Sequence, residues 1–359
     1  MISVIVLTYN QQTTIARTLE SVLCQRCDCP VEVVIGEDGS SDGTRDVCKD
    51  YARRYPDKVR LMPESPNKGV IDNYFDCLLA CRGEYIADCA GDDWWIDEQK
   101  LQKELDVMRA DASVTIVHTA YKAAAADTEG FQLSTFNFQL STCKGRHEAS
   151  PSCLNRPKSA LIGLSQGLHI TEGKSMLEDI ITQTGRPVIH LCTALYRKDV
   201  LMKAYRSDTF LFRNNEFGCE DLQVCCALAA AGNVAFLSDC TLCYSLGQDT
   251  ISYSPDDRKQ FVFKRRTGDL SFYLCRKYGI SSRKTRAFFA RRLTALLMHA
   301  FRIKDKTLRR EAVDCRRRWK AGLTCYSATV LAATSNTAFW SAALGLRKYL
   351  LKLKTHGPR

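Results

Sequence analysis

Four short apolar segments alternate with helix-like segments in the first ninety residues, and this alternation constrains the fold more than any other feature. The apolar segments are residues 3–10, 31–36, 59–62 and 85–87. Between the first two, Ile15, Leu19 and Val22 recur at the spacing of one helix face. Strands that alternate with helices form a mostly parallel sheet covered by helices. The sequence therefore predicts an α/β fold with an open, doubly wound sheet.

Polar residues collect where the apolar segments end. They are Thr8, Tyr9 and Asn10 after the first, Glu37 and Asp38 after the second, Asn67 and Lys68 after the third, and Asp92 and Asp93 after the fourth. The carboxyl ends of parallel strands meet at one edge of a sheet, and ligands of such folds bind there. We therefore expect these side chains to line one cleft.

Glu37 and Asp38 are candidates for binding a base or a ribose, as acidic residues at the end of a second strand do in ribose recognition. The alternative is that Asp38 and Asp42, each followed by glycine, are only turn residues. The sequence has no Gly-x-Gly-x-x-Gly after its first strand and no P-loop. Dinucleotide and P-loop sites are therefore excluded.

The segment 91–95, Gly-Asp-Asp-Trp-Trp, places two carboxylates side by side at the end of the fourth strand. Neighbouring aspartates repel one another unless a cation or hydrogen-bond donors lie between them. Divalent cations such as Mg²⁺ prefer oxygen ligands. The segment therefore predicts a metal site at Asp92 and Asp93, and a solvated turn is the alternative.

Four of these segments together carry a family resemblance. They are 3–10 (SVIVLTYN), 37–44 (EDGSSDGT), 67–69 (NKG) and 91–95 (GDDWW). In this order and spacing the chain resembles family 2 glycosyltransferases, most closely over its first 110 or so residues and more weakly to residue 255. The resemblance implies the GT-A fold, in which a Rossmann-like, mostly parallel sheet is flanked by helices and binds a nucleotide-diphospho-sugar.

The resemblance also implies roles for the polar residues. Thr8, Tyr9, Asn10, Glu37 and Asp38 would hold the nucleoside, Asn67 and Lys68 would lie along the nucleotide pocket, and Asp92 would match the Asp-x-Asp element that binds metal and diphosphate. The family usually has an acidic residue two positions before that aspartate, whereas this chain has Ala90. We therefore expect a Mn²⁺ or Mg²⁺ ion that has few protein ligands and takes its remaining ligands from water and phosphate oxygens.

A second acidic segment, 214–222, leads into a helix that we expect to continue to about residue 231. It resembles the family segment in which an acidic residue at a helix start serves as general base, and Asp221 or Glu220 matches that residue. A carboxylate can take the proton of an acceptor hydroxyl when it lies within hydrogen-bond reach. The alternative is that both residues only interact favourably with the helix dipole. With the upstream motifs present, we favour Asp221.

The chain divides by composition. Residues 1–255 form the expected glycosyltransferase domain, in which 122–185 lack periodicity and read as an irregular insertion on the acceptor side. Residues 256–359 are helical and basic, and they account for the positive net charge of +11. A basic helical end with aromatic residues suits an anionic membrane face. A helical appendage with a solvated basic rim is the alternative, and nucleic acid is not expected because no binding motif accompanies the charge.

The eighteen cysteines are scattered through predicted strands and helices, which is typical of reduced, buried thiols. Cys24, Cys27 and Cys29, and separately Cys240 and Cys243, have some likeness to zinc-ligand spacings. No histidine completes either group, so zinc is not expected there. The amino terminus has no basic segment or cleavage site of a signal peptide, and we expect a cytoplasmic protein, at the inner face of the cell membrane if its basic end binds lipid.

The resemblance implies an inverting, metal-assisted glycosyltransferase of the hexosyltransferase type. We expect it to move a sugar from a nucleotide-diphosphate donor, specifically a UDP-sugar, to a hydroxyl of a glycan or lipid-linked glycan. The product would belong to a surface polysaccharide or lipopolysaccharide. A sugar nucleotidyltransferase is one alternative. A catalytically weakened glycan-binding or scaffold member of the same fold is another, because Ala90 replaces an acidic residue.

Overall fold

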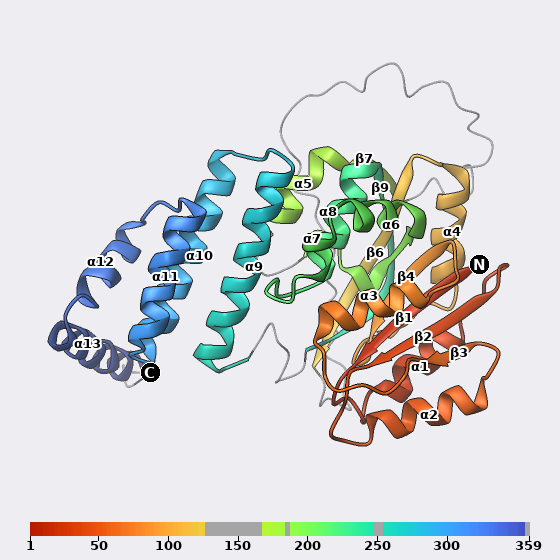
Figure 1. Cartoon of the computed structure of the whole chain (residues 1–359), viewed down its shortest axis with the longest axis horizontal. Helices are drawn as coiled ribbons and strands as arrows, with labels where there is room; N and C mark the ends of the chain where they lie inside the picture. Colours follow the sequence, from red (N-terminus) through yellow and green to blue (C-terminus); the bar gives the residue numbers. More distant parts are fainter. Residues whose placement is uncertain (126–166, 184–186, 247–253, 356–359) are drawn as a thin grey trace, which may run out of the picture. The chain divides into compact units, whose positions relative to one another are not determined.

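The computed structural model describes residues 1–125, 167–183, 187–246 and 254–355. The chain forms two compact units (Figure 1). Unit 1 contains Met1–Asn215 and Cys219–Leu246, and unit 2 contains Glu216–Gly218 and Gly247–Arg359. The candidate cleft belongs to unit 1.

The sheet of unit 1 begins with the parallel strands that the apolar segments predict. Its strands are β1 (Ile2–Thr8), β2 (Val31–Glu37), β3 (Val59–Leu61), β4 (Tyr85–Ala90), β5 (Trp94–Trp95), β6 (Val114–Ala125), β7 (Leu168–Glu172), β8 (Ala194–Arg197) and β9 (Asn233–Leu246). Their order is β3-β2-β1-β4-β8-β6-β9-β5, and β7 pairs with β9. Because β1 to β4 are parallel, their carboxyl ends share one edge of the sheet.

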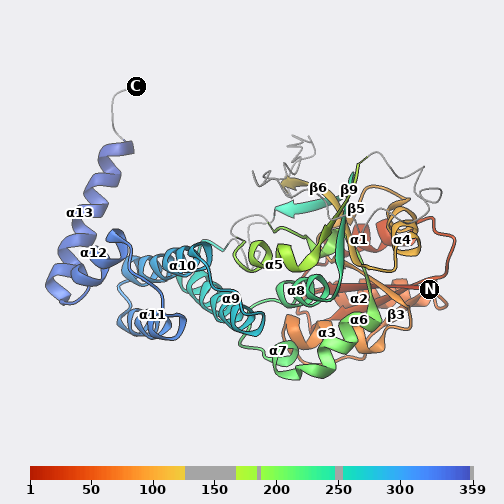
Figure 2. The same ribbon diagram turned by 90° about the horizontal axis from the view of Figure 1, so that it is seen from above.

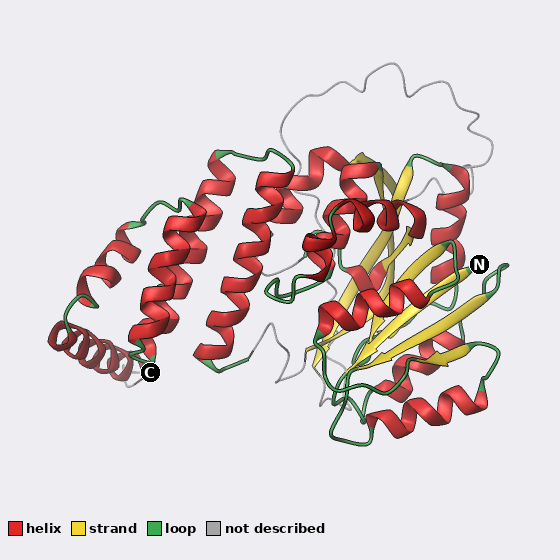
Figure 3. Ribbon diagram, in the orientation of Figure 1, coloured by secondary structure: helices red, strands yellow, loops and turns green. Residues whose placement is uncertain are grey.

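Helices cover both faces of this sheet, which Figure 3 shows as a central layer. The helices are α1 (Ile15–Leu23), α2 (Thr44–Arg54), α3 (Val70–Ala80), α4 (Lys100–Ala110), α5 (Gly173–Ile181), α6 (Lys198–Ser207), α7 (Thr209–Arg213) and α8 (Asp221–Ala231), with a 3-10 turn, η3, at Leu191–Thr193. One core joins β1, β2 and β4 to apolar side chains of α1, α2 and α4. Figure 2 shows α3, α6, α7 and α8 grouped on the other side. The predicted doubly wound α/β architecture is confirmed.

Several elements differ from the sequence prediction. β4 continues through Asp88 to Ala90, because burial on both faces overrides the polar side chain in the strand. The pairing of β9 with β6 is interrupted by register shifts.

The region expected to be irregular, 122–185, is only partly described. Its described residues include the end of β6 and all of β7 and α5, so they are regular structure. Pairing with β9 makes β7 a strand despite its weak alternation, since sheet context often outweighs local pattern. Residues 126–166 and 184–186 lie outside the described residues, and the acceptor-side role of this region stays a prediction.

Unit 2 is helical, as its composition predicts. It contains α9 (Asp257–Lys277), α10 (Arg283–Arg302), α11 (Lys306–Trp319), α12 (Cys325–Ala333) and α13 (Thr337–Thr355). The buried Trp319 indole donates to Asp269 at 2.8 Å and so joins α11 to α9. The Trp340 indole donates to the carbonyl oxygen of Phe301 at 3.1 Å and so joins α13 to α10. Among the helices of the described residues, none has a stretch apolar enough and long enough to cross a bilayer.

Candidate functional site

The loops that follow β1 and β2 are locked together at the carboxyl edge of the sheet. The side-chain oxygen of Asn10 accepts a hydrogen bond from the Ser41 amide at 2.8 Å, and the Asn10 amide donates to the Ser40 hydroxyl at 2.9 Å. Asn10 has a φ of 52°, a left-handed conformation that asparagine tolerates better than most residues. Its amide oxygen therefore orders the loop, while Tyr9 is 49% exposed at the same edge.

Glu37 is a buried carboxylate at the end of β2. It accepts hydrogen bonds from the Ser40 amide at 2.5 Å and from the Arg45 guanidinium at 2.9 Å. Burial acts to raise the pKa of Glu37, but these hydrogen bonds outweigh it and hold the pKa below its usual value. Glu37 therefore stays ionised and fixes Arg45 in place.

A surface cavity of about 400 Å³ opens beside this ion pair at the ends of β2 and β3. It is lined by Glu37, Gly39, Ser40, Arg45, Glu64, Ser65 and Pro66. Gly39 has a φ of +70°, and a Cβ there would lie 2.8 Å from the Asn67 amide nitrogen. A glycine is required at this wall because no side chain fits between the two loops.

Asp38 joins the loop after β2 to the loop before α3. Its two carboxylate oxygens accept the backbone amides of Lys68 at 2.9 Å and Gly69 at 3.0 Å. The Asn67 side chain donates to the Asp38 carbonyl oxygen at 2.9 Å, and the Lys68 ammonium pairs with Asp76 at 2.7 Å. The structure thus brings Asp38, Asn67 and Lys68 together, as the sequence predicts, in one hydrogen-bonded wall.

Asp93 carries an unsatisfied carboxylate oxygen at the end of β4. It is 1% exposed, and its Oδ1 accepts the Ser245 amide of β9 at 2.9 Å, whereas its Oδ2 has no hydrogen-bond partner among the described residues. Burial and the charge of Asp92 raise the pKa of Asp93 well above its usual value. An orphaned carboxylate oxygen beside a second carboxylate is a place where a cation would be stabilised.

Asp92 is half-buried beside Asp93, and burial raises its pKa, although the neighbouring side chains of Gln11 and Arg17 act in the opposite direction. Arg17 donates to the Asp92 carbonyl oxygen at 3.3 Å and stacks on Trp94 at 3.5 Å from the ring centroid. Two oxygen ligands fit a Mg²⁺ or Mn²⁺ ion that takes its remaining ligands from water and phosphate. The described residues offer no third carboxylate close enough to complete a protein cage here.

Gln11 is a site residue that the sequence reasoning missed. Its side-chain oxygen accepts a hydrogen bond from the Thr8 hydroxyl at 2.8 Å, and its backbone N–H donates to the Thr44 hydroxyl at 2.8 Å. The Gln11 side chain also acts to lower the pKa of Asp92. A Cβ on Gly91 would collide with Gln11 and with Thr8, so the strand ends approach closely. The one sequence signal for Gln11 is its position directly after Thr8, Tyr9 and Asn10, the polar residues at the end of the first strand.

A second group of acidic side chains lies where the start of α8 meets the face of β4 that is opposite the α1–α4 core. Asp88 of β4 interacts electrostatically with Glu220 and Asp221. The Tyr196 hydroxyl interacts with the buried Asp88 carboxylate. The nearby Tyr196 hydroxyl is hydrogen bonded to that of Tyr74. The structure therefore brings both predicted base candidates near β4, the strand that the Asp92 and Asp93 segment follows.

The two base candidates differ in what the structure shows of their surroundings. Burial, together with the charges of Asp221 and Asp88, raises the pKa of Glu220 to about 8. Glu220 is therefore mainly protonated near neutral pH and is a poor proton acceptor there. Asp221 begins α8, and its Oδ1 accepts the Leu222 amide at 3.2 Å. The raised pKa of Glu220 is unfavourable for a general base near neutral pH.

Asp88 predicts a specific pH dependence of stability. Burial raises the pKa of Asp88 to about 8, although the Tyr196 hydroxyl and the charge of Lys100 both act to lower it. The folded state then binds a proton that the unfolded state releases near pH 4, so stability falls between about pH 4 and pH 8 and levels off above. We expect Asp88→Asn to flatten this decline and to stabilise the protein at pH 9, by an amount on the order of several kcal/mol, at about 1.4 kcal/mol per unit of pKa shift.

Urea denaturation midpoints between pH 5 and pH 9 measure this difference. Replacement of the exposed Asp57 by asparagine is the matched control, and its midpoint curve should parallel that of the wild type. Parallel curves for the Asp88→Asn variant and the wild type would show that Asp88 is not protonated in the folded protein.

The partly buried His190 ring packs against Tyr121 and Tyr244, with ring centroids 4.9 Å away in each case, and burial of the ring lowers its pKa to about 4. It is therefore neutral at physiological pH.

Comparisons with known proteins identify the family and the fold. The model of glycosyl transferase family 2 matches residues 3–204, which is more than half of the chain. An uncharacterized protein of Mycobacterium tuberculosis is 38% identical over 131 residues, covering 35% of this chain and 38% of that protein. A Bacillus subtilis protein provisionally named as the teichuronic acid biosynthesis glycosyltransferase TuaG is 32% identical over 127 residues, covering 35% and 49%. The chain thus matches less than half the length of these relatives.

Among solved structures, TarS residues 1–349 of Staphylococcus aureus in complex with UDP-GlcNAc aligns with a TM-score of 0.50 at 16% identity. The alignment covers 88% of this chain and 91% of that one. At this identity the likeness concerns the fold alone, and it agrees with the mixed sheet, the flanking helices and the helical carboxyl-terminal region described above.

Proposed function

Because the chain belongs to glycosyl transferase family 2, we propose that it transfers a sugar from a nucleotide-diphosphate donor, and specifically from a UDP-sugar, to a hydroxyl of a glycan or lipid-linked glycan that becomes part of a surface polysaccharide or lipopolysaccharide. The observation that carries the proposal is the orphaned, buried Asp93 oxygen beside Asp92, at the sheet edge where the locked loops of Asn10 and Asp38 also end. A diphosphate with its counter-ion is the ligand that this charge arrangement fits.

In this proposal the nucleoside lies against the loops after β1 and β2. Tyr9 is exposed and offers a ring face for stacking, and the cavity beside Glu37 and Arg45 has room for part of the nucleoside. Glu37 and Asp38 act mainly through the loops that they hold, because their carboxylates are already hydrogen bonded to the protein. Thr8, Asn67 and Lys68 complete the wall.

Asp92 and Asp93 would hold a Mn²⁺ or Mg²⁺ ion, which neutralises the charge that develops on the departing diphosphate. Asp221 takes the proton of the acceptor hydroxyl as the acceptor oxygen forms its bond to the anomeric carbon. The bond between that carbon and the diphosphate oxygen breaks, and the nucleoside diphosphate leaves. Attack on the face opposite the leaving group inverts the anomeric configuration.

A product assay tests the proposal against a nucleotidyltransferase. Incubation with a panel of nucleotide sugars and either Mn²⁺ or Mg²⁺ is expected to release nucleoside diphosphate, by hydrolysis or by transfer to an added acceptor. Release of pyrophosphate from a nucleoside triphosphate and a sugar phosphate would identify a nucleotidyltransferase instead. Nucleotide binding without turnover on any donor would favour a weakened glycan-binding or scaffold role.

We also propose that unit 2 contacts an anionic membrane face at the cytoplasmic side, where lipid-linked acceptors would be found. Residues 247–359 contain 26 Lys and Arg against 7 Asp and Glu, whereas residues 1–246 contain 25 against 33. Exposed apolar side chains stand on the same unit, at Tyr326 of α12 and at Phe339 and Leu346 of α13. Basic and exposed apolar groups together favour binding to anionic lipid.

Removal of charge from unit 2 is expected to weaken membrane binding. Arg310, Arg316 and Lys320 are exposed on or just after α11, and their joint replacement by glutamine should reduce binding roughly 100-fold, at about 1 kcal/mol for each basic residue near the lipid surface. Co-sedimentation with phosphatidylserine-containing vesicles at low salt measures it. The matched control replaces Arg53, Arg54 and Lys58, which are exposed in unit 1, and should bind as the wild type does. Equal loss in both variants, or no loss in either, would contradict the proposal.

A further inference from the structure

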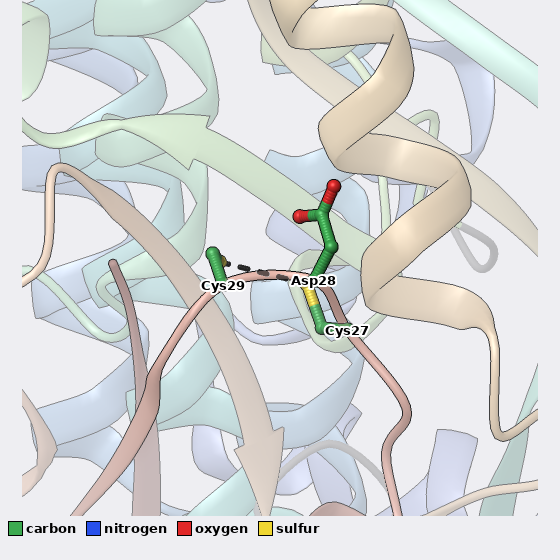
Figure 4. A group of neighbouring side chains, drawn as sticks. All are labelled: Cys27, Asp28 and Cys29. Carbon is green, nitrogen blue, oxygen red and sulfur yellow. Dashed lines mark hydrogen bonds between the residues drawn. The ribbon is translucent and has the colours of Figure 1, made fainter.

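The loop between α1 and β2 brings two thiols and a carboxylate together. Cys27, Asp28 and Cys29 each offer one potential metal-binding atom, and these atoms all lie within 4.8 Å of one another. The two sulfur atoms are 3.5 Å apart, and Figure 4 shows their hydrogen bond beside the Asp28 side chain. Within the described residues, this is the one group of three or more such side chains so close together.

Side chains and backbone near α4 hold this loop in place. The Arg109 guanidinium donates to Asp28 Oδ2 at 2.6 Å, and the Asp28 amide donates to the Gln102 side chain at 2.8 Å. The Arg26 amide donates to the carbonyl oxygen of Glu98 at 2.8 Å. Metal-binding carboxylates are commonly oriented by such an outer hydrogen bond. Arg109 thus fixes one oxygen of Asp28 and leaves Oδ1 for a cation.

The thiols are also placed by packing. Cys27 and Cys29 are partly buried and pack against the hydrophobic core of β1, β2, α1 and α4. Neither thiol belongs to a disulfide. Side chains of α4 already hold the backbone conformation of the loop. Both sulfur atoms can therefore bind one ion with little rearrangement of the loop.

The sulfur spacing indicates which ion fits. Two thiolates bound to tetrahedral Zn²⁺ at about 2.3 Å each lie about 3.8 Å apart, close to the separation found here. Thiolate ligands favour Zn²⁺ over Mg²⁺ and Ca²⁺, which prefer oxygen. We propose that Cys27, Asp28 and Cys29 bind one Zn²⁺ ion, with water as a fourth ligand.

This site is separate from the candidate cleft. The loop precedes β2, at the amino edge of the sheet, whereas Glu37 and Asp92 follow strands at the carboxyl edge. The ion therefore plays a structural part by joining the α1–β2 connection to α4 through Arg109. The inference does not depend on the proposed transferase activity.

Zinc binding by the full chain tests the proposal. The reduced, metal-free protein is titrated with Zn²⁺ in competition with a chromophoric chelator, and with Co²⁺ to detect tetrahedral thiolate absorption. Because the chain has eighteen cysteines, the comparison between variants decides the result. We expect Cys27→Ser/Cys29→Ser to lose one equivalent of zinc, and Arg109→Gln to bind that equivalent 10- to 100-fold more weakly.

Cys24→Ser is the matched control, because Cys24 is exposed on the same loop and its thiol donates to the Ser21 carbonyl oxygen instead. It should keep the full equivalent. A cooperative urea denaturation in the absence of metal, with a midpoint close to that of the wild type, checks that each variant is folded. Equal zinc stoichiometry and affinity in the wild type and the double variant would overturn the proposal, as would a Cys27–Cys29 disulfide formed in place of metal binding.

Discussion

Asp221→Asn is expected to reduce glycosyl transfer by about 100-fold to 10,000-fold, the usual contribution of a general base, while donor binding stays close to that of the wild type. Asparagine keeps the size and the hydrogen bond to the Leu222 amide but cannot accept the proton of the acceptor hydroxyl. Steady-state rates with a saturating donor, together with calorimetric donor affinity, separate these two effects.

Two further variants sharpen this prediction. Glu220→Gln should cause a much smaller loss, because burial and its neighbours keep Glu220 mainly protonated near neutral pH. Asp199→Asn removes an exposed carboxylate on α6 and should leave the rate unchanged. If Glu220→Gln reduced the rate more than Asp221→Asn, the base would be Glu220, and full activity in Asp221→Asn would remove Asp221 from this role.

Asp92→Asn is expected to abolish metal-dependent donor binding and to reduce transfer by at least about 100-fold, as the loss of one electrostatic group at a developing charge does. Asp92 and Asp93 are the two neighbouring carboxylates that follow β4, and one oxygen of Asp93 already accepts the Ser245 amide. The remaining oxygen of Asp93 cannot hold the ion alone.

The comparison for this variant is Asp46→Asn, which removes an exposed carboxylate from α2 in the same unit. It should bind donor and metal as the wild type does. Calorimetric titration of UDP with and without Mn²⁺ measures both variants. Unchanged metal dependence in Asp92→Asn would move the metal site away from the end of β4.

The sheet could be predicted from the sequence because local pattern and final environment agree. Val4, Val33 and Ile35 belong to apolar runs, and each is buried in the core between strands and helices. Parallel pairing then places the polar strand ends at one edge without any further information. The meeting of Asp38 with Lys68 follows from that geometry.

Asp88 shows what local pattern cannot reveal. A carboxylate after Ala87 reads as the end of a strand, since ionised groups are rarely buried without partners. Here β4 continues through it, and burial favours its protonated, neutral form. That environment is made by Tyr196 and by α8, which are more than one hundred residues away in the sequence.

Long-range partners also explain the other differences. Ser245 satisfies one oxygen of Asp93 across 152 positions, and the Arg109 partner of Asp28 comes from α4 across 81 positions. The spacing of Cys27 and Cys29 alone does not indicate that Asp28 lies beside both thiols, and a carboxylate is a third ligand type for zinc. The local sequence around Asp93 or Asp28 does not predict the contact with Ser245 or with Arg109.

Calorimetric titration with UDP and GDP, with Mn²⁺ or Mg²⁺ and after metal removal, tests the central claim most directly. A nucleotide cleft at the carboxyl edge of β1, β2 and β4 predicts saturable binding of one nucleoside diphosphate per chain, which requires the metal and is lost in Asp92→Asn. Absence of binding by either nucleotide, or binding that neither metal removal nor Asp92→Asn affects, would contradict it.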